Sequence, residues 1–462
     1  MCGVVAGVGP ADLGPAVDAL HHRGPDARGL TTVAGVSLGH TRLAILDVDP
    51  RANQPYTSGP VRLAYNGELW NFQELRAELA AGGAEFTTTG DTEVVAAALA
   101  VWGAGALDRF EGMFAAAWTT GDGLLHLARD RYGEIPLHWA ASRAQSYAAS
   151  EIKALRVLGV GLDAIRDVEP GEHLTIGPAG TVERERWYRT PAAPVVVDLP
   201  AAAVELRARL AAAVDARSVS DRPVCTLLSG GIDSAAIAVE LARTCRDLVA
   251  YTAVYDPRSR DLRCARQVAA ALGIPLVEVA VPAPTADDLA GVVRRIELDS
   301  KAQVEIGWPC LRLAAAMAGN GHRVTFSGEG SDELWASYGF AYHGLKTAGW
   351  HPYRRDLFAT QARRNFPRAN KAFMAYGVEM RLPFLHRPVV EYALSLPRHA
   401  VQDGKARPKA VLQDAYAGAL PGEVLRRPKV AFQDGMGIKT AAGRAVTAPV
   451  RFYRAELRAA YA

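Results

Sequence analysis

The six residues from Ser229 to Ser234, SGGIDS, combine the groups that could bind a phosphate. Two glycines let the backbone approach a ligand closely, and N–H groups at the start of a helix attract anions. Asp233 would place a carboxylate beside that phosphate, which is favourable only where a cation joins the two groups. The stretch therefore predicts an anion site that also holds Mg²⁺. The alternative is an ordinary tight turn between a strand and a helix.

A second glycine-rich stretch, Ser327–Glu333 (SGEGSDE), is crowded with acidic side chains. Neighbouring carboxylates repel one another unless a cation or a lysine lies between them. Shared Mg²⁺ binding by Asp233 and Asp332 would explain the crowding, whereas a solvated loop is the alternative. Lys405 and Lys409 stand farther on, at the predicted start of a helix. A lysine that reached the α-phosphate of a nucleotide would stabilise charge there, and a surface lysine is the other interpretation.

Cys2 is the candidate nucleophile near the start of the chain. Removal of the initiator Met would place its thiol beside a free α-amine that can accept the thiol proton. A cysteine at the start of a buried strand is the alternative.

Polar residues farther along the first hundred could bind a free amino acid. Arg42 and Asp91 supply the charges that suit an α-carboxylate and an α-ammonium group. The Asn66 amide and the Gly67 N–H group could form an oxyanion hole for attack on a side-chain amide. Each has an ordinary alternative, because Asn66-Gly67 also suits a hairpin turn and Arg42 a surface salt bridge.

The elements that must hold these residues follow from the spacing of apolar positions. Buried strands are predicted at residues 224–228, 248–254, 276–281 and 323–326, and helices at 199–218, from 232 and at 261–272. Val204, Leu206, Leu210 and Val214 would form the apolar side of the first helix. Alternating strands and helices predict a doubly wound parallel sheet, whose ligands bind at the carboxyl ends of the strands. In the first half, strands are predicted at residues 40–47 and 63–68, and Asp91 or Thr92 is the predicted N-cap of the helix that follows.

The chain resembles two protein families in these motifs. SGGIDS resembles the pyrophosphate loop of ATP pyrophosphatases, which cleave ATP between its α- and β-phosphates. Residues 1–190 resemble the class II glutamine amidotransferase domain, an N-terminal nucleophile glutaminase, through the Cys2 start and the motifs HRGPD, HTRLAILD, YNGELWN and TGDTEV. The resemblance implies an α+β sandwich of antiparallel sheets with helices outside, and Cys2 as the nucleophile. The implied glutamine-site residues are Arg42, Asn66, Gly67, Glu68 and Asp91.

Essentially the whole chain resembles glutamine-dependent asparagine synthetase, through SGGIDS, SGEGSDE, RANKA, GVEMRLPFL and FQDG. The resemblance implies a glutaminase domain at residues 1–190 and an α/β ATP-pyrophosphatase domain at residues 200–462. The Pro/Ala-rich composition of residues 190–200 predicts a linker between them, with the boundary near residue 195. The resemblance also implies that ATP and Mg²⁺ activate a carboxylic acid as an acyl-adenylate, which ammonia from glutamine reaches through an internal tunnel. The implied ATP-binding residues are Leu227, Ser229, Gly230, Gly231, Asp233, Ser234, Ser327 and Gly328; the metal ligands are Asp233 and Asp332; and the catalytic residues of this domain are Glu329 and Lys409. Lys409 is preferred to Lys405 because it directly precedes the apolar triplet Ala-Val-Leu.

One stretch departs from the family pattern. After Ile296-Glu297, asparagine synthetases carry roughly TIRASTPM, whereas this chain has LDSKAQVEIGWPC. If Pro309 matches the family proline, Glu305 replaces an arginine, and Lys301 and Trp308 complete the predicted acceptor pocket. A buried glutamate would repel the α-carboxylate of aspartate, and Trp308 offers flat apolar area. We therefore expect an acceptor acid other than aspartate, one with a ring or an amine. The alternatives are that this loop faces solvent or that Lys301 replaces the missing charge.

Composition narrows the function classes. With 49% hydrophobic residues, 22% charged residues and a net charge of +3, the chain is typical of a globular protein, and its charge does not favour nucleic acid or membrane as a partner. The five cysteines show no disulfide or zinc spacing, which favours a reducing, cytoplasmic compartment. No signal peptide or membrane span is expected.

Three interpretations compete. The leading one is an ATP- and glutamine-dependent amidotransferase, either on another acid or on aspartate itself. A relative of β-lactam synthetase or of lasso-peptide cyclases would need no ammonia, and the first domain of such enzymes tends to lose its nucleophile. A non-catalytic regulator would bind glutamine or nucleotide only. Intact Cys2, Arg42, Asn66 and Asp91 favour ammonia, and Cys2, Glu329 and Lys409 together argue against a regulator. The expected partners are glutamine, ATP and a carboxylic acid, and the resemblance leaves a homodimer open.

Overall fold

The computed structural model describes residues 1–461 except residues 11, 192–193, 196, 339–348, 403–406, 408, 428–429 and 431, and except the side chains of 432 and 433. Part of the predicted linker near residue 195 therefore lies outside the described residues. The chain divides into two compact units. The first consists of Met1–Arg189, Met374–Val378 and Leu457–Ala462, and the second of Thr190–Phe373 and Glu379–Glu456.

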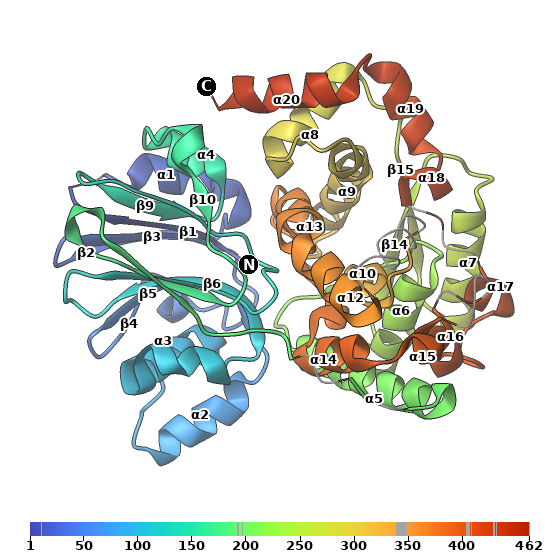
Figure 1. Ribbon diagram of the computed structural model, residues 1–462, viewed down its shortest axis with the longest axis horizontal. Helices are drawn as coiled ribbons and strands as arrows, with labels where there is room; N and C mark the ends of the chain where they lie inside the picture. Colours follow the sequence, from blue (N-terminus) through green and yellow to red (C-terminus); the bar gives the residue numbers. More distant parts are fainter. Residues whose placement is uncertain are drawn as a thin grey trace. The chain divides into compact units, whose positions relative to one another are not determined.

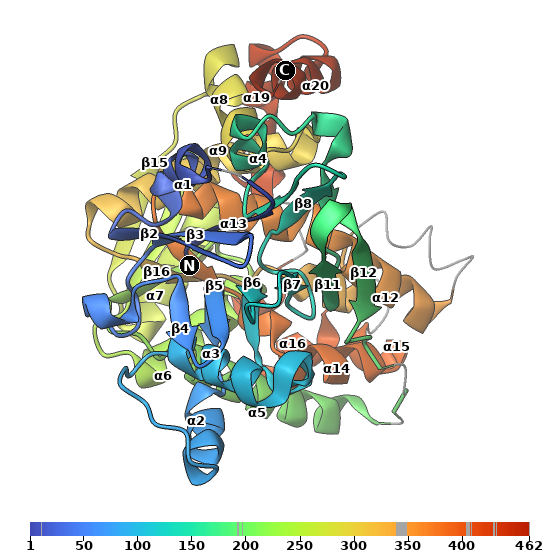
Figure 2. The same cartoon turned by 90° about the vertical axis from the view of Figure 1, so that its left-hand side faces the viewer.

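Two six-stranded antiparallel sheets form the described part of the first unit. One has the order β10 (Arg166–Asp167), β8 (His138–Ala141), β9 (Ser146–Ala149), β1 (Gly3–Val8), β3 (Val36–Arg42) and β2 (Ala27–Val33). The other has the order β12 (Val182–Arg186), β11 (Glu172–Ile176), β7 (Leu125–Arg129), β6 (Gly112–Thr119), β5 (Val61–Leu69) and β4 (Tyr56–Ser58). Figures 1 and 2 show the sheets as stacked layers.

Helices cover the outer faces of both sheets (Figure 1). Those over the first sheet are α1 (Gly14–Ala19) and α4 (Ile152–Val157), and those over the second are α2 (Phe72–Ala81) and α3 (Asp91–Trp102). Every residue of β1 is buried, because this strand lies between a helix layer and the other sheet. The predicted sandwich with outer helices is confirmed.

A five-stranded parallel sheet forms the centre of the described part of the second unit. Its order is β15 (Leu276–Ala280), β14 (Val249–Val254), β13 (Val224–Leu227), β16 (Val324–Phe326) and β17 (Glu379–Arg381). The chain therefore adds β14 and β15 on one side of β13 and later returns to add β16 and β17 on the other side. In sheets of this kind, ligands bind at this point of reversal, outside the carboxyl ends of the strands. The predicted doubly wound parallel sheet is confirmed, with the four predicted strands each within one residue of their bounds.

Helices surround this sheet (Figure 1). The described helices that lie wholly or mostly in this unit are α5 (Leu199–Arg217), α6 (Ile232–Thr244), α7 (Arg260–Leu272), α8 (Ala286–Ile296), α9 (Lys301–Gly319), α10 (Ser331–Trp335), α12 (Trp350–Ala359), α13 (Asn365–Met374), α14 (Arg387–Ser395), α15 (Arg398–Val401), α16 (Ala410–Ala415), α17 (Gly422–Leu425), α18 (Phe432–Gly435), α19 (Ile438–Ala445) and α20 (Pro449–Ala460). Right-handed crossovers place α6 and α7 on one face and α8 and α9 on the other, because the chain reverses direction after β15.

Two strands of the first unit differ from their prediction. β3 ends at Arg42, and the chain then bends so that the carbonyl groups of Leu46 and Asp47 accept hydrogen bonds from Arg42. β5 continues to Leu69, so Asn66 and Gly67 lie inside a paired strand. The hairpin turn considered for Asn66-Gly67 is therefore wrong.

Two details of the predicted helices are also wrong. Val204 is 74% exposed, because it lies about half a turn from the buried face that Leu206, Leu210 and Val214 form on α5. The N-cap of α3 is Gly90, and Asp91 is the first helical residue. Its carboxylate accepts a hydrogen bond from the Leu69 N–H group at 2.9 Å instead of capping the helix.

The part of the chain that the structure describes contains no helix with the length and apolar character needed to cross a membrane.

Candidate functional site

Asn66 connects the two sheets of the first unit at the start of the chain. It is fully buried on β5, and its Oδ1 atom accepts a hydrogen bond from the backbone nitrogen of Cys2 at 2.7 Å. Its Nδ2 atom donates to Ser150 Oγ at 3.4 Å, and the same hydroxyl accepts from the Val4 N–H group at 2.9 Å. The amide is thus held in one orientation, with the oxygen toward Cys2.

Arg23 holds Cys2 from a second direction, although no individual role was predicted for it. Its Nε donates to the Cys2 carbonyl at 2.9 Å and its Nη1 to Glu151 Oε1 at 2.7 Å. Lys153 and His22 contact the other oxygen of Glu151 at 2.5 and 3.0 Å. These positive neighbours outweigh the effect of burial and hold the pKa of Glu151 well below its usual range. Arg23 lies in HRGPD, and its partners are far apart in sequence, so only the motif could have indicated it.

Arg42 is buried and is not a surface salt bridge. Its Nη1 atom donates to the Asp49 carbonyl at 2.9 Å and to Asn53 Oδ1 at 2.8 Å, and its Nη2 donates to the Leu46 and Asp47 carbonyls. In this arrangement Arg42 organises the loop after β3.

The other predicted glutamine-site residues follow Asn66 on β5 or begin α3. Glu68 and Asp91 are both 5% exposed. Gly67 lies against β6 so closely that a Cβ atom would be 2.1 Å from the Met113 carbonyl oxygen. Only glycine fits there without separating the strands. β5 contacts both β3 and α3, so the fold brings the elements that carry these residues together.

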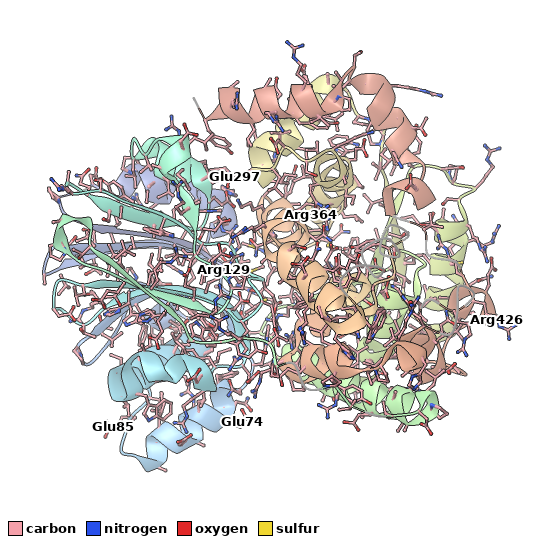
Figure 3. The ribbon with its side chains drawn as sticks, viewed as in Figure 1. Glu74, Glu85, Arg129, Glu297, Arg364 and Arg426 are labelled. Atoms are coloured by element: carbon pink, nitrogen blue, oxygen red, sulfur yellow. The ribbon has the colours of Figure 1, made fainter. Side chains whose placement is uncertain are left out.

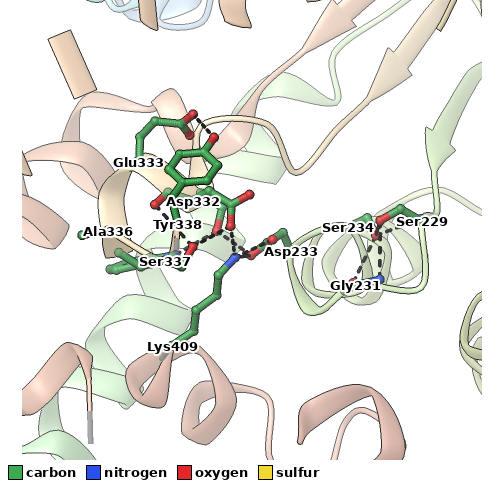
Figure 4. A network of polar contacts seen from close by, with 12 residues as sticks. Ser229, Gly231, Asp233, Ser234, Asp332, Glu333, Ala336, Ser337, Tyr338 and Lys409 are labelled. Carbon is green, nitrogen blue, oxygen red and sulfur yellow. Dashed lines mark hydrogen bonds and ion pairs between the residues drawn. The ribbon is translucent and has the colours of Figure 1, made fainter. Parts of the chain in front are cut away.

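Lys409, at the start of α16, joins the two glycine loops of the second unit (Figure 4). Its Nζ lies 2.6 Å from both carboxylate oxygens of Asp233 and 2.6 Å from Asp332 Oδ1. The lysine side chain is 3% exposed, and the two carboxylates are 15% and 17% exposed. Lys405 lies outside the described residues.

The loop after β13 turns its hydroxyl groups toward one another. Ser234 Oγ lies 3.1 Å from Ser229 Oγ and accepts a hydrogen bond from the Ser229 N–H group at 3.1 Å. Gly230 has a φ of +73°, which favours glycine. Leu227 is the last residue of β13. The predicted phosphate-binding residues thus occupy the point where the sheet reverses.

The two glycine loops touch each other. A Cβ atom on Gly328 would lie 2.8 Å from the Ser234 nitrogen, and Ser331 Oγ donates to Asp233 Oδ1 at 2.7 Å. Ser327 Oγ accepts a hydrogen bond from the Glu329 N–H group at 3.2 Å. Strands adjacent in the sheet but about one hundred residues apart in the chain therefore deliver their loops to one place.

This donor set fits Mg²⁺. Two carboxylates converge on a single cationic group, and magnesium is commonly held by one or two carboxylates together with substrate phosphates. No cluster of three or more metal-ligating side chains occurs among the residues that the structure describes. The site suits a metal that arrives with a nucleotide better than a cage supplied wholly by protein.

Behind Asp332 a buried polar network links two further acids. Arg368, on α13, donates to Glu329 Oε1 at 2.5 Å and to Gln303 Oε1 at 3.0 Å. Gln303 donates to Asn365 Oδ1 at 2.8 Å, and Asn365 donates to Glu333 Oε1 at 2.7 Å. Because arginine can only donate, it fixes the orientation of both amides.

Glu333, at the end of this network, also accepts a hydrogen bond from the Tyr338 hydroxyl at 2.6 Å (Figure 4). Burial, together with the charges of Asp332 and Glu329, raises the pKa of Glu333 to about 7.

The predicted acceptor residues Lys301, Glu305 and Trp308 lie on one face of α9, at intervals of four and three residues. Gln303 lies on the opposite face. Glu305 is buried, and Lys301 Nζ lies 3.7 Å from its Oε1 atom; burial raises the pKa of its carboxyl group. Trp308 Nε1 donates to the Pro282 carbonyl at 3.0 Å. Among the described residues, none of the three forms a hydrogen bond or an ion pair with the network around Glu329, so the structure brings them together but not to that network.

Comparison with known proteins places two family models on the chain. A glutamine amidotransferase domain matches residues 1–175, and asparagine synthase matches residues 205–371 and 354–448. Asparagine synthetase B of Escherichia coli K12 is 31% identical over 439 residues, covering 90% of this chain and 78% of its own. Asparagine synthetase 2 of Oryza sativa subsp. japonica is 29% identical, covering 95% and 78%. Both relatives are named as glutamine-hydrolysing.

Among solved structures, glutamine phosphoribosylpyrophosphate amidotransferase from B. subtilis aligns with 60% of this chain and 65% of its own at 21% identity. The TM-score of 0.37 is too low to support an argument.

Proposed function

The chain belongs to the asparagine synthase family of glutamine-hydrolysing carbon–nitrogen ligases, and from that premise we propose that it adenylates a carboxylic acid with ATP and converts it to an amide with ammonia from glutamine. The carboxylate would displace pyrophosphate from ATP to give an acyl-adenylate. Ammonia would then displace AMP and leave the amide. The observation that carries the proposal is the convergence of Asp233, Asp332 and Lys409 at the reversal of a parallel sheet.

We assign the release of ammonia to residues 1–190. After removal of Met1, the α-amine of Cys2 would accept the thiol proton, and the thiolate would attack the glutamine side-chain amide. Asn66 and the Gly67 N–H group would stabilise the oxyanion, while Glu68, Asp91 and Arg42 would bind the amino-acid end of glutamine, with Arg42 exchanging part of its contacts with the loop after β3 for the carboxylate. The contact between the Cys2 nitrogen and the Asn66 oxygen supports this assignment. The same contact favours ammonia over an amine of the acceptor as the nucleophile. An enzyme that needs no ammonia would not need an ordered Cys2 for glutamine hydrolysis.

We assign adenylation to residues 200–462. The SGGIDS loop with Leu227, Ser327 and Gly328 would bind ATP, and Asp233 and Asp332 would hold Mg²⁺, which neutralises phosphate oxygens. Lys409 would then be released from at least part of its ion pairing and could reach the α-phosphate. Glu329, held by Arg368, would serve the acceptor side of the reaction.

For the acceptor we propose an acid whose far end is neutral or carries an amine, rather than aspartate. In the part of the network that the structure describes, Arg368 is the one cationic side chain, and its two Nη atoms already donate to Glu329 and Gln303. A second carboxylate on the acceptor would lie near the charge of Glu329 and be repelled by it, whereas an amine would be attracted to it. Glu305 lies on the other face of α9 and therefore does not face this network.

We propose a reducing compartment such as the cytoplasm, which the free state of all five cysteines supports; each of them is among the described residues.

The test is an incubation of the full-length protein with ATP, Mg²⁺, a panel of carboxylic acids and either glutamine or ammonia. Release of AMP and pyrophosphate in equal amounts, dependent on one of the acids, is the expected result. Release of ADP, or nucleotide turnover independent of every acid, would contradict the proposal. Efficient formation of asparagine, with kcat/KM of about 10⁴ M⁻¹s⁻¹ or more, would restore aspartate as the acceptor.

A further inference from the structure

Arg427, two residues after α17, contacts the loop after β13 from outside the motifs discussed so far. Its Nη1 donates to the Gly230 carbonyl at 3.1 Å, and its Nη2 donates to Asp261 Oδ1. The Arg427 side chain is 8% exposed. Gly230 precedes Arg427 by 197 residues, so the contact joins distant parts of the chain.

The Gly230 carbonyl and the N–H group of Gly231 belong to one trans peptide unit, since the cis bond among the described residues is Gln54-Pro55. In a trans unit these two groups point in opposite directions. The Gly231 N–H lies 3.4 Å from Ser229 Oγ, on the side where the loop gathers its hydroxyl groups. Arg427 and the interior of the loop therefore lie on opposite sides of the same peptide.

We propose that Arg427 is a positioning residue for the pyrophosphate portion of ATP. By binding the Gly230 carbonyl, its guanidinium group fixes the peptide with the N–H group turned into the loop. A cation on a carbonyl also polarises the peptide, which makes its N–H group a stronger donor to an anion. This inference rests on the proposed adenylation function and adds to it a residue outside the loop.

Asp261 holds Arg427 in place, and Gly435 in turn packs against Asp261. Asp261, in the first turn of α7, accepts the hydrogen bond from Arg427 Nη2. Gly435 packs against that carboxylate so closely that a Cβ atom would lie 2.4 Å from Asp261 Oδ2.

α17 itself is anchored to α7. Glu423 accepts hydrogen bonds from Arg260 at 3.2 Å, Arg263 at 3.5 Å and Gln267 at 3.1 Å. The neighbouring Arg426 is exposed, and its side chain points outward at the right-hand edge of the view in Figure 3. The chain therefore offers two adjacent arginines, of which one contacts the loop and the other does not.

The experiment compares Arg427→Gln with Arg426→Gln in the full-length protein. The readouts are the Kd of Mg²⁺ with α,β-methylene-ATP by calorimetry, the KM for ATP in pyrophosphate release, and glutamine hydrolysis without ATP. For Arg427→Gln we expect the Kd and the KM to rise about tenfold or more, because a charge-assisted hydrogen bond is lost. Glutamine hydrolysis should stay at the wild-type rate, and Arg426→Gln should match the wild type throughout.

Two further variants separate positioning from folding. Arg427→Lys keeps the charge but not the paired geometry, and should recover part of the affinity. Gly435→Ala leaves Arg427 unchanged but displaces Asp261, and should raise the Kd in the same direction.

A folded Arg427→Gln protein that binds the analogue as the wild type does would overturn the inference, as would equal weakening in Arg426→Gln. A wild-type protein that binds no analogue would refute the proposed adenylation function itself, and this inference with it.

Discussion

Lys409 neutralises two carboxylates at once, and this dual contact lies at the centre of the proposed adenylation site. An amide in place of either carboxylate keeps the shape but removes the charge that attracts a divalent cation. We expect Asp233→Asn and Asp332→Asn each to lower the rate of acyl-adenylate formation by about 100-fold or more. Pyrophosphate release measures this step, and glutamine hydrolysis is the internal control, which should survive. A variant with normal pyrophosphate release would not be a metal ligand.

Gln303 is the residue on α9 that we expect to control acceptor choice. In the register in which Pro309 matches the family proline, Gln303 stands where the family stretch has its first threonine. Threonine is too short to reach both Arg368 and Asn365, so Gln303→Thr would remove the hydrogen bond that holds Arg368 Nη1 and let the guanidinium group turn toward an acceptor carboxylate. The ratio of kcat/KM for aspartate to that for the preferred acid should rise about tenfold. Steady-state assays with ammonia as nitrogen donor measure it.

Glu305→Gln, on the opposite face of the same helix, is the matched control for this prediction. It should leave the ratio unchanged. If instead Glu305→Gln shifts the ratio and Gln303→Thr does not, the original interpretation of Glu305 as the acceptor residue holds.

At the scale of elements, β3 carries a buried histidine that connects stability to pH. Burial, together with the charge of Arg42, lowers the pKa of His40 to about 3, and its Nε2 lies 3.0 Å from the Tyr65 carbonyl. In the unfolded chain a histidine is protonated below about pH 6.5. Between these values unfolding takes up a proton, so the free energy of unfolding falls as the pH decreases from 6.5 to 3.

We therefore expect the first unit to lose stability in this pH range by an amount on the order of a few kcal/mol. Thermal unfolding followed at pH 7, 5 and 4 measures the loss, and His40→Gln should reduce its dependence on pH. A wild-type transition temperature that does not change from pH 7 to pH 4 would contradict the prediction.

Sequence patterns predicted the elements of the second unit better than those of the first. Strands such as β13 and β14 are short apolar runs between turn residues, and a run of this kind rarely forms anything other than a buried strand. The extent of β3 and β5 could not be predicted, because it depends on where Arg42 finds its carbonyl groups and on the pairing of Gly67 with β6. Helix periodicity failed at Val204 because a single apolar residue carries no information about which face is covered.

The same distinction applies to the sites. Asp233, Asp332 and Lys409 could be proposed from motifs, since each lies in or beside a recognisable stretch. Gln303 and Arg427 could not, and Arg23 could be proposed only through the motif HRGPD, because what marks all three is a partner between 21 and 197 residues away in the chain. A long-range hydrogen bond leaves no local pattern.

At the scale of the whole molecule, the two sets of candidate residues belong to different units. Cys2→Ala should therefore abolish glutamine-dependent amide formation and leave ammonia-dependent formation close to the wild-type rate. Product formation with each nitrogen donor, in the same preparation, tests this. Loss of both activities in a folded variant would mean that the two chemistries are not separate.

The order of the chain also has a consequence for synthesis on the ribosome. Lys409 follows Asp233 by 176 residues and Asp332 by 77. The nascent second unit thus carries two facing acids long before their counter-charge has been translated. Until residue 409 emerges, electrostatic repulsion opposes the closure of the two glycine loops. A chain arrested before residue 409 emerges should, in the absence of Mg²⁺, keep these two loops apart and sensitive to protease, whereas arrest after its emergence should let them close.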